Sequence, residues 1–173
     1  MKEIKVDVLS RKSVMEAKNQ IRQYKKDLEN KLERFANRLK SEGFQILNLR
    51  VTNIPPVYRG DTTPDVVINK TGKNSYEIRL SISGSECTFV EFGTGVTFNG
   101  AKGSSPHPKG AELGMTIGNY GKGQGAKSNG WFFRNKYGDI EHTYGIPMQA
   151  PLYYTSKEIK QKIKSIALEV WSE

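Results

Sequence analysis

The sequence predicts an α+β fold: an antiparallel sheet with a long N-terminal helix and a C-terminal helix packed on one face, plus a long glycine-rich loop. Apolar residues recur at helical spacing near both ends of the chain, and between them lie segments that alternate apolar and polar residues. Helices on one face of an antiparallel sheet suit this order of elements. We expect one domain over residues 1–173, in which residues 99–130 form a flexible glycine-rich insert.

A strand and a long helix are expected first. Ile4, Val6 and Val8 alternate with charged residues, which is the period of a half-buried strand. Ser13 starts a capping box, and Gly43 predicts a left-handed helix end, about 29 residues or roughly 43 Å further on. The apolar stripe of this helix comprises Val14, Ala17, Ile21, Tyr24, Leu28, Leu32, Phe35 and Leu39.

Strands and turns are expected after this helix. Residues 44–51 are rich in β-forming residues, and Pro55 and Pro56 end that strand because proline donates no ladder hydrogen bond. The clearest hairpin spans residues 66–82, where two alternating runs flank a polar, glycine-containing turn. Residues 88–92 continue as a strand or a short helix.

The last third of the chain opens with the glycine-rich segment. Residues 99–130 contain nine glycines and two prolines, and a long run without regular structure is typical of a functional loop. A second hairpin is expected at residues 131–144, with its turn at residues 137–139. Thr155 and Glu158 predict the start of the closing helix, whose apolar stripe comprises Ile159, Ile163, Ile166 and Val170.

The net charge of +9 is concentrated in two segments. Residues 11–42 carry ten Lys or Arg and five Asp or Glu. Residues 97–130 carry four Lys and one Glu. Such an excess attracts nucleic acid or an acidic protein surface. The expected contact residues are Lys18, Arg22 and Lys25 on one helix face, and Lys122 and Lys127 in the glycine-rich segment.

Two patterns come close to catalytic motifs, and both fall short of them. Residues 121–128 approach a phosphate-binding loop, but Ala126 stands in place of a glycine and no strand or helix flanks the segment. Asp65 and Glu77 resemble the acid pair of metal-dependent nucleases. Arg79 replaces the lysine of that pattern and, being permanently protonated, cannot act as a base. We therefore expect no enzyme and no cofactor.

The remaining chemically active residue types are few. His107 and His142 show no metal-ligand spacing with each other or with Cys87, so we expect them to be surface or hydrogen-bonded residues. The single cysteine excludes an internal disulfide and suits a reducing cytosol. The sequence has no run approaching the roughly 18 apolar residues of a membrane helix, so no membrane association is expected.

Several motifs, in order, resemble a known family. A long basic helix from Val14 comes first, and a glycine-rich insert separates two short motifs that precede a closing helix. These motifs are Val90-Glu91-Phe92-Gly93-Thr94-Gly95 and Gly145-Ile146-Pro147-Met148-Gln149-Ala150-Pro151-Leu152. The order is similar to the tail-completion or head–tail joining family of tailed bacteriophages, which shares an E-F-G-T stretch and a G-x-P-A-x-P-F-like turn. Met148 and Leu152 depart from the family's usual Ala and Phe.

The resemblance implies a ring-forming neck subunit of a virion, assembled in the bacterial host cytoplasm, that joins a tail to a DNA-filled head. Its implied partners are further copies of itself, other neck, connector and tail-terminator proteins, and DNA in the ring lumen. The stretch from Glu91 to Gly95 would form a tight turn at a strand end, and Gly145, Pro147 and Pro151 would fix the path into the last helix. A basic DNA-binding module using the long helix and the glycine-rich loop stays open as the alternative.

Overall fold

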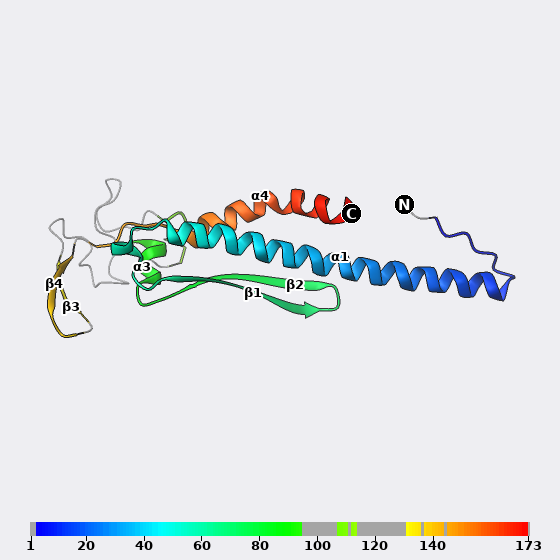
Figure 1. Ribbon diagram of the computed structural model, residues 1–173, viewed down its shortest axis with the longest axis horizontal. Coiled ribbons are helices and arrows are strands. Elements are labelled where there is room, and N and C mark those ends of the chain that lie inside the picture. Colours follow the sequence, from blue (N-terminus) through cyan, green and yellow to red (C-terminus); the bar gives the residue numbers. More distant parts are fainter. Residues whose placement is uncertain are drawn as a thin grey trace.

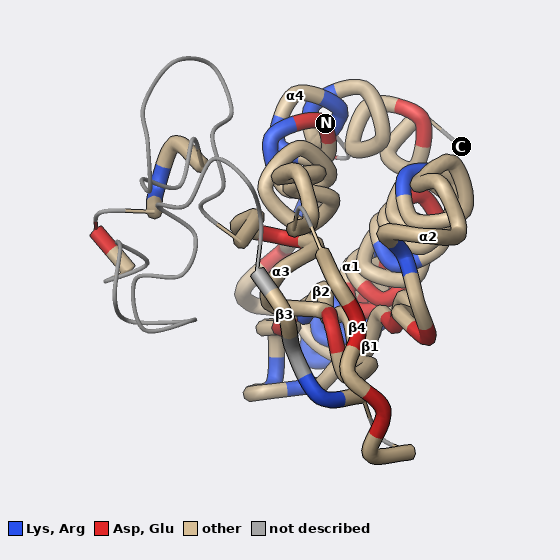
Figure 2. Tube along the Cα trace, turned by 90° about the vertical axis from the view of Figure 1, so that its left-hand side faces the viewer, with Lys and Arg blue, Asp and Glu red and all other residues tan. Residues whose placement is uncertain are grey.

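The structure is a computed structural model that describes residues 3–94, 107–110, 112–113, 131–135, 137–143 and 145–172. It is elongated along helix α1 (Arg11–Thr52), whose 42 residues span about 63 Å (Figure 1). A hairpin of two strands lies along one side of α1, and a second long helix lies along another (Figure 2). The hairpin consists of β1 (Thr63–Gly72) and β2 (Ser75–Ser83), and the second long helix is α4 (Pro151–Ser172).

Three shorter features lie toward the C-terminal end of α1. Helix α2 (Pro56–Arg59) follows α1, and helix α3 (Cys87–Phe92) follows the hairpin. Strands β3 (Trp131–Arg134) and β4 (Ile140–Thr143) pair as the second predicted hairpin. The α+β fold class is thus confirmed, with a long N-terminal helix, an antiparallel hairpin and a C-terminal helix packed together.

Helix α1 starts earlier and ends later than the sequence predicted. Ser10 is its N-cap, and the Ser10 hydroxyl accepts a hydrogen bond from the Ser13 amide at 3.3 Å. The predicted end at Gly43 and the predicted strand over residues 44–51 are wrong, because the helix continues to Thr52. Gly43, Leu47 and Val51 are buried at intervals of four residues, so burial on one helix face outweighs the β-propensity of this segment.

The lack of a side chain at Gly43 allows three elements to approach each other. A Cβ atom there would lie 3.2 Å from Leu80 Cδ2 and 3.8 Å from Ile159 Cδ1. Leu80 belongs to β2 and Ile159 to α4, so both elements pack over this point of α1. Gly43 therefore serves helix packing and not helix termination.

The first hairpin lies where the sequence predicted it and supplies the sheet side of the core. Its strands pair in an antiparallel register with Val66 opposite Leu80. Alternate residues face α1, as the period of a half-buried strand requires. The core cluster consists of Leu47, Val51 and Val66, with Ile78, Leu80, Ile82 and Leu152 packed against it.

Ion pairs hold α4 antiparallel to α1. Arg50 donates to Glu158 at 2.7 Å, and Lys162 donates to Glu42 at 2.6 Å. The hydrogen bond to Glu42 raises the pKa of Lys162, an effect that partial desolvation of the ammonium opposes. Near the end of α4 the Lys31 ammonium donates to the Trp171 carbonyl oxygen at 3.3 Å. Helix α4 therefore ends level with about residue 31 of α1.

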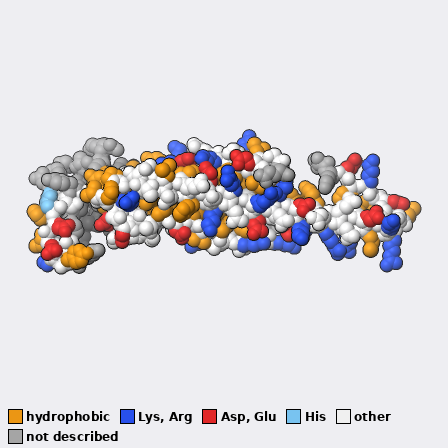
Figure 3. Space-filling model, in the orientation of Figure 1, with side chains coloured by type: hydrophobic (Ala, Val, Ile, Leu, Met, Phe, Trp, Pro, Cys, Tyr) orange, Lys and Arg blue, Asp and Glu red, His pale blue; other side chains and the backbone are white. Residues whose placement is uncertain are grey.

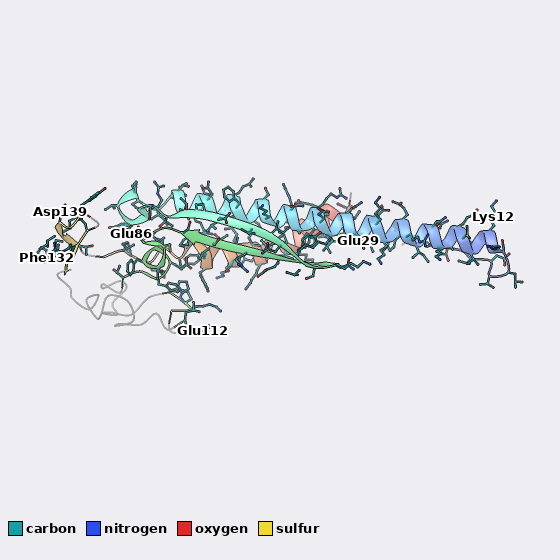
Figure 4. All side chains as sticks on the ribbon, turned by 90° about the horizontal axis from the view of Figure 1, so that it is seen from below. Lys12, Glu29, Glu86, Glu112, Phe132 and Asp139 are labelled. Atoms are coloured by element: carbon teal, nitrogen blue, oxygen red, sulfur yellow. The ribbon has the colours of Figure 1, made fainter. Side chains whose placement is uncertain are left out.

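The first half of α1 extends beyond the layers that pack on its second half. Figure 4 shows Lys12 at the far end of this extension and Glu29 near the tip of the first hairpin. Of the predicted apolar stripe, Ala17 and Leu39 are buried, but the expected burial of Ile21 and Leu28 is wrong, because these residues are 56% and 39% exposed. Helix α4 ends level with about residue 31 and therefore covers neither of them.

Three further segments can be compared with the sequence predictions; two of those predictions are wrong, and for the third the structure selects one of two alternatives. Residues 4–8 do not form a strand; the segment pairs with no strand among the described residues and is largely exposed. Residues 88–92 belong to helix α3, one of the two predicted alternatives. Helix α4 begins at Pro151, four residues before the predicted start at Thr155, because proline suits a first helical position whose amide has no partner in the helix.

We predict that Leu→Ala substitutions at different positions of α1 will lower the free energy of unfolding by very different amounts. Leu47→Ala removes a fully buried side chain and should lower the free energy of unfolding by about 2–5 kcal/mol. Leu28→Ala should cost less than about 1 kcal/mol in the isolated chain, because Leu28 is exposed. Urea unfolding at concentrations where the chain is monomeric measures both values. Equal losses would contradict the assignment of the buried face.

Candidate functional site

Two motifs that are distant in sequence meet at what we call the α3–α4 junction, formed by residues 90–94, His107 and residues 145–153. At its centre is Glu91, a carboxylate that is 5% exposed. Its Oε2 atom accepts from the Leu152 amide at 2.9 Å, and its Oε1 atom accepts from the Tyr153 amide at 3.0 Å. Both amides lie in the first turn of α4, where they have no partner inside the helix.

Glu91 belongs to α3, yet its side chain caps the start of α4. Side chains that accept from the first amides of a helix stabilise its start. The carboxylate also places a negative charge at the positive end of the helix dipole. The junction thereby fixes where α4 begins and how α3 is oriented against it.

His107 completes the set of hydrogen bonds to Glu91. The imidazole is buried, and its Nε2 atom lies 3.1 Å from Glu91 Oε1. Its Nδ1 atom accepts from the Lys109 amide at 3.0 Å. Because Nδ1 accepts, Nε2 carries the hydrogen and donates to the carboxylate. The ring also contacts those of Phe92 and Tyr153, with centroid distances of 4.5 and 5.2 Å.

Backbone hydrogen bonds join the two motifs on both sides of Glu91. The Val90 carbonyl oxygen accepts from the Gln149 amide at 2.9 Å. At the other end of the motif the Thr94 amide donates to the Ile146 carbonyl oxygen at 3.0 Å. The Ile146 amide in turn donates to Thr94 Oγ1 at 3.0 Å. Residues 90–94 and 146–150 are thus paired as one unit.

Gly93 allows this close approach. Its φ of +74° lies in the region that favours glycine, and a Cβ atom there would lie 2.9 Å from the Met148 amide nitrogen. The tight turn expected at Gly93 is present, but it ends helix α3 and not a strand. Gly145 also has a positive φ, of +87°. Gly95 lies outside the described residues.

The remaining members of the two motifs also pack at the junction. Pro147 is half-buried, and its carbonyl oxygen accepts from the Gln149 side-chain amide at 3.0 Å. Pro151 is fully buried at the first position of α4. Both carboxylate oxygens of Glu91 already accept hydrogen bonds, so the arrangement serves to hold α3, the His107 segment and α4 together.

The structure separates the residues that resembled a nuclease site. In the hairpin register Asp65 lies opposite Ser81, whereas Glu77 lies opposite Asn69. Glu77 instead forms a same-strand ion pair with Arg79 at 3.4 Å. Within the described residues no three His, Cys, Asp or Glu side chains gather into a possible metal site. The phosphate-loop-like segment, with Lys122 and Lys127, lies outside the described residues, as does most of residues 99–130.

The basic residues predicted on α1 are exposed on its extended half. Lys18, Arg22 and Lys25 lie on one helix face beyond the end of α4. In the space-filling view, Lys and Arg side chains gather over this part of α1 (Figure 3). A hydrogen bond and electrostatic repulsion from Lys73 in the hairpin turn lower the pKa of Lys25. The hairpin tip therefore adds a further positive charge beside this face.

A second feature is a groove of about 740 Å³ that we call the β2–α4 groove. Leu80, Ile82 and Leu152 give it apolar walls, and Lys157 and Lys160 stand exposed on the α4 side. Residues of α3, including Cys87, also line the groove, as do His107, Lys109 and Leu113.

The sequence analysis missed the link between Glu91 and α4. A signal for it was present, because Pro151 marks a helix start that no Ser, Thr, Asp or Asn immediately precedes. Such a helix needs a cap from elsewhere in the fold. The pairing of His107 with Glu91 had no comparable signal, because the two residues lie 16 positions apart.

Comparisons of the chain with family models, with curated proteins and with solved structures gave no match. Among the described residues, no helix combines the length and apolar character needed to cross a membrane.

We predict that the junction depends on the charge of Glu91. Glu91→Gln keeps one acceptor but removes the charge at the α4 start, and should lower the free energy of unfolding by about 1–3 kcal/mol. Glu91→Ala leaves buried donors without an acceptor and should cost about 3–5 kcal/mol. The matched control is Glu112→Gln, which disrupts the exposed Lys109–Glu112 pair and should change stability by less than about 0.5 kcal/mol. Thermal and urea unfolding measure all three. Equal stability of Glu91→Gln and wild type would contradict the capping role.

Proposed function

We propose that this chain is a ring-forming neck subunit of a tailed bacteriophage or a phage-derived particle, which completes the tail and joins it to the head. It assembles in the host cytoplasm and becomes part of the virion. Its partners are further copies of itself and the connector, tail-terminator and other neck proteins, with DNA passing through the ring lumen. The activity is structural, so the chain needs no enzyme site and no cofactor.

The α3–α4 junction is the observation that carries this proposal. The E-F-G-T stretch and the G-x-P-containing turn are the two motifs by which the sequence resembles the neck family. In the fold, Thr94 of the first motif hydrogen-bonds to Ile146 of the second, and Glu91 accepts from Leu152 of the second motif and from the adjacent Tyr153. The resemblance therefore concerns one spatial unit and not two independent short matches. It also reaches α4, whose start the first motif fixes.

The exposed apolar surface supports an assembled state. Large apolar side chains remain exposed on both long helices, and burial against other chains would remove this surface from water. On α4, Ile163 is 41%, Leu168 62% and Trp171 41% exposed, and on α1 Ile21 is 56% exposed. A closed ring of identical subunits buries such surface without leaving open contacts.

The direct test is electron microscopy of the purified protein, alone and mixed with isolated tails and DNA-filled heads. We expect closed rings of uniform diameter that attach to one end of the tail and permit heads to join. Addition of bovine serum albumin in place of the protein is the control for nonspecific adhesion. A chain that stays monomeric at about 100 µM and leaves the tails unjoined would contradict the proposal.

A DNA-binding module is the second candidate, because Lys18, Arg22 and Lys25 are exposed beside Lys73. For this candidate, log K should fall with log salt by about 0.9 for each phosphate neutralised. A Lys18→Gln, Arg22→Gln, Lys25→Gln variant should then reduce that slope by up to about 3 × 0.9, or 2.7. The matched control is Lys157→Gln with Lys160→Gln on α4. An unchanged slope in the triple variant would exclude this face as the DNA contact.

A further inference from the structure

We propose that the β2–α4 groove receives residues Ile4–Val8 of a neighbouring copy, which add to β2 as a third strand. This inference rests on the proposed ring and names the contact that builds it. Each copy would donate its N-terminal segment to one neighbour and accept a segment from the other. Such a head-to-tail contact uses two different surfaces of each subunit, which is the kind of interface that closes into a ring.

Among the described residues, β1 is the only strand that pairs with β2. Helix α1 packs over both β1 and β2, and α4 packs against β2. The first sheet has two strands in the described part of the chain, so β2 has an edge that no described strand occupies. Unpaired strand edges present amides and carbonyl groups that bind an added strand. The groove lies between this strand and α4.

The chemistry of residues 4–8 suits this groove. Ile4, Val6 and Val8 alternate, so as a strand they form one apolar face that can pack on Leu80, Ile82 and Leu152. The opposite face carries Lys5 and Asp7, one positive and one negative charge. The exposed residues on the α4 side of the groove are the two lysines, Lys157 and Lys160.

The dimensions also agree. On the α4 side the groove runs from Leu152 to Lys160, which is about 12 Å at about 1.5 Å per helical residue. Residues 4–8 span about 13 Å as a strand, at about 3.3 Å per residue. A five-residue segment therefore matches the groove in length.

The segment cannot reach the groove of its own chain. Leu80 and Ile159 pack over Gly43, which places the groove beside that part of α1. From the N-cap Ser10 to Gly43 the helix covers about 50 Å. Residues 3–9, even fully extended, cover at most about 25 Å. In the free chain Val6 and Val8 are instead 45% and 80% exposed. Only another copy can supply this strand to the groove.

Cys87 provides the test, because it lines the groove and is the only cysteine in the chain. Ile4→Cys and Val8→Cys are made separately in the full-length protein, which is oxidised and run on a nonreducing gel. Whether Ile4 or Val8 lies nearer to α3 depends on the direction in which the added strand runs. We therefore expect one of the two variants to form a disulfide with Cys87 of the next copy. Each chain then carries one introduced cysteine in its N-terminal segment and Cys87 in its groove. Disulfides can therefore link successive copies, and the gel should show a ladder of bands extending beyond the dimer.

Two controls separate this ladder from chance oxidation. The same variant carrying Cys87→Ser has one cysteine per chain and can link only two copies, so it should stop at the dimer. Lys12→Cys, on α1 beyond the segment, should give no ladder with Cys87. Deleting residues 3–8 should weaken ring association at least tenfold, as measured by mass photometry.

The outcomes distinguish this inference from the proposed function. Rings that join tails but give no ladder from either variant would overturn strand exchange and leave the neck function intact. Rings that form unchanged after deletion of residues 3–8 would also overturn strand exchange and leave the neck function intact. Failure to form rings and to join tails would overturn both. A ladder together with the loss of rings on deletion would support both.

Discussion

The buried carboxylate of Glu91 is the contact on which the arrangement of this fold depends. A charge that is 5% exposed has lost most of its hydration, so it is stable only where donors replace the water. Two amides of α4 and the His107 imidazole supply these donors from segments far apart in sequence. The same contact caps α4, which then lies antiparallel to α1 and brings Glu158 within 2.7 Å of Arg50.

The second constraint is that α1 is longer than the layers packed on it. Its C-terminal half contributes Leu47 and Val51 to the core, whereas Ile21 and Leu28 near its other end stay exposed. One end of the molecule therefore carries the junction, and the other carries a basic and partly apolar helix. This division suits a subunit that packs against neighbours along its length. Both proposals follow from it, since each assigns a partner to surface that the single chain leaves open.

Sequence reasoning succeeded where local pattern and tertiary structure agree. The alternation in the first hairpin predicted its inner face, including Val66 and Leu80, because strand period and burial coincide there. It failed at Gly43, whose role comes from the approach of Leu80 and Ile159, two residues that no local pattern connects to it. In the candidate site, the family resemblance implied the turn at Gly93, although that turn ends a helix and not a strand. The capping role of Glu91 was not predicted, because it depends on how α3 and α4 meet.

Hydrogen exchange at the Leu152 and Tyr153 amides, read by nuclear magnetic resonance, tests the capping claim most directly. Amides in the first turn of an uncapped helix exchange rapidly, because they have no partner in the helix. We expect slow exchange at both amides in the wild-type chain. In Glu91→Gln we expect rapid exchange at both, with the Leu47 amide in α1 still protected. Rapid exchange at Leu152 and Tyr153 in the wild-type chain, or protection that Glu91→Gln leaves unchanged, would contradict it.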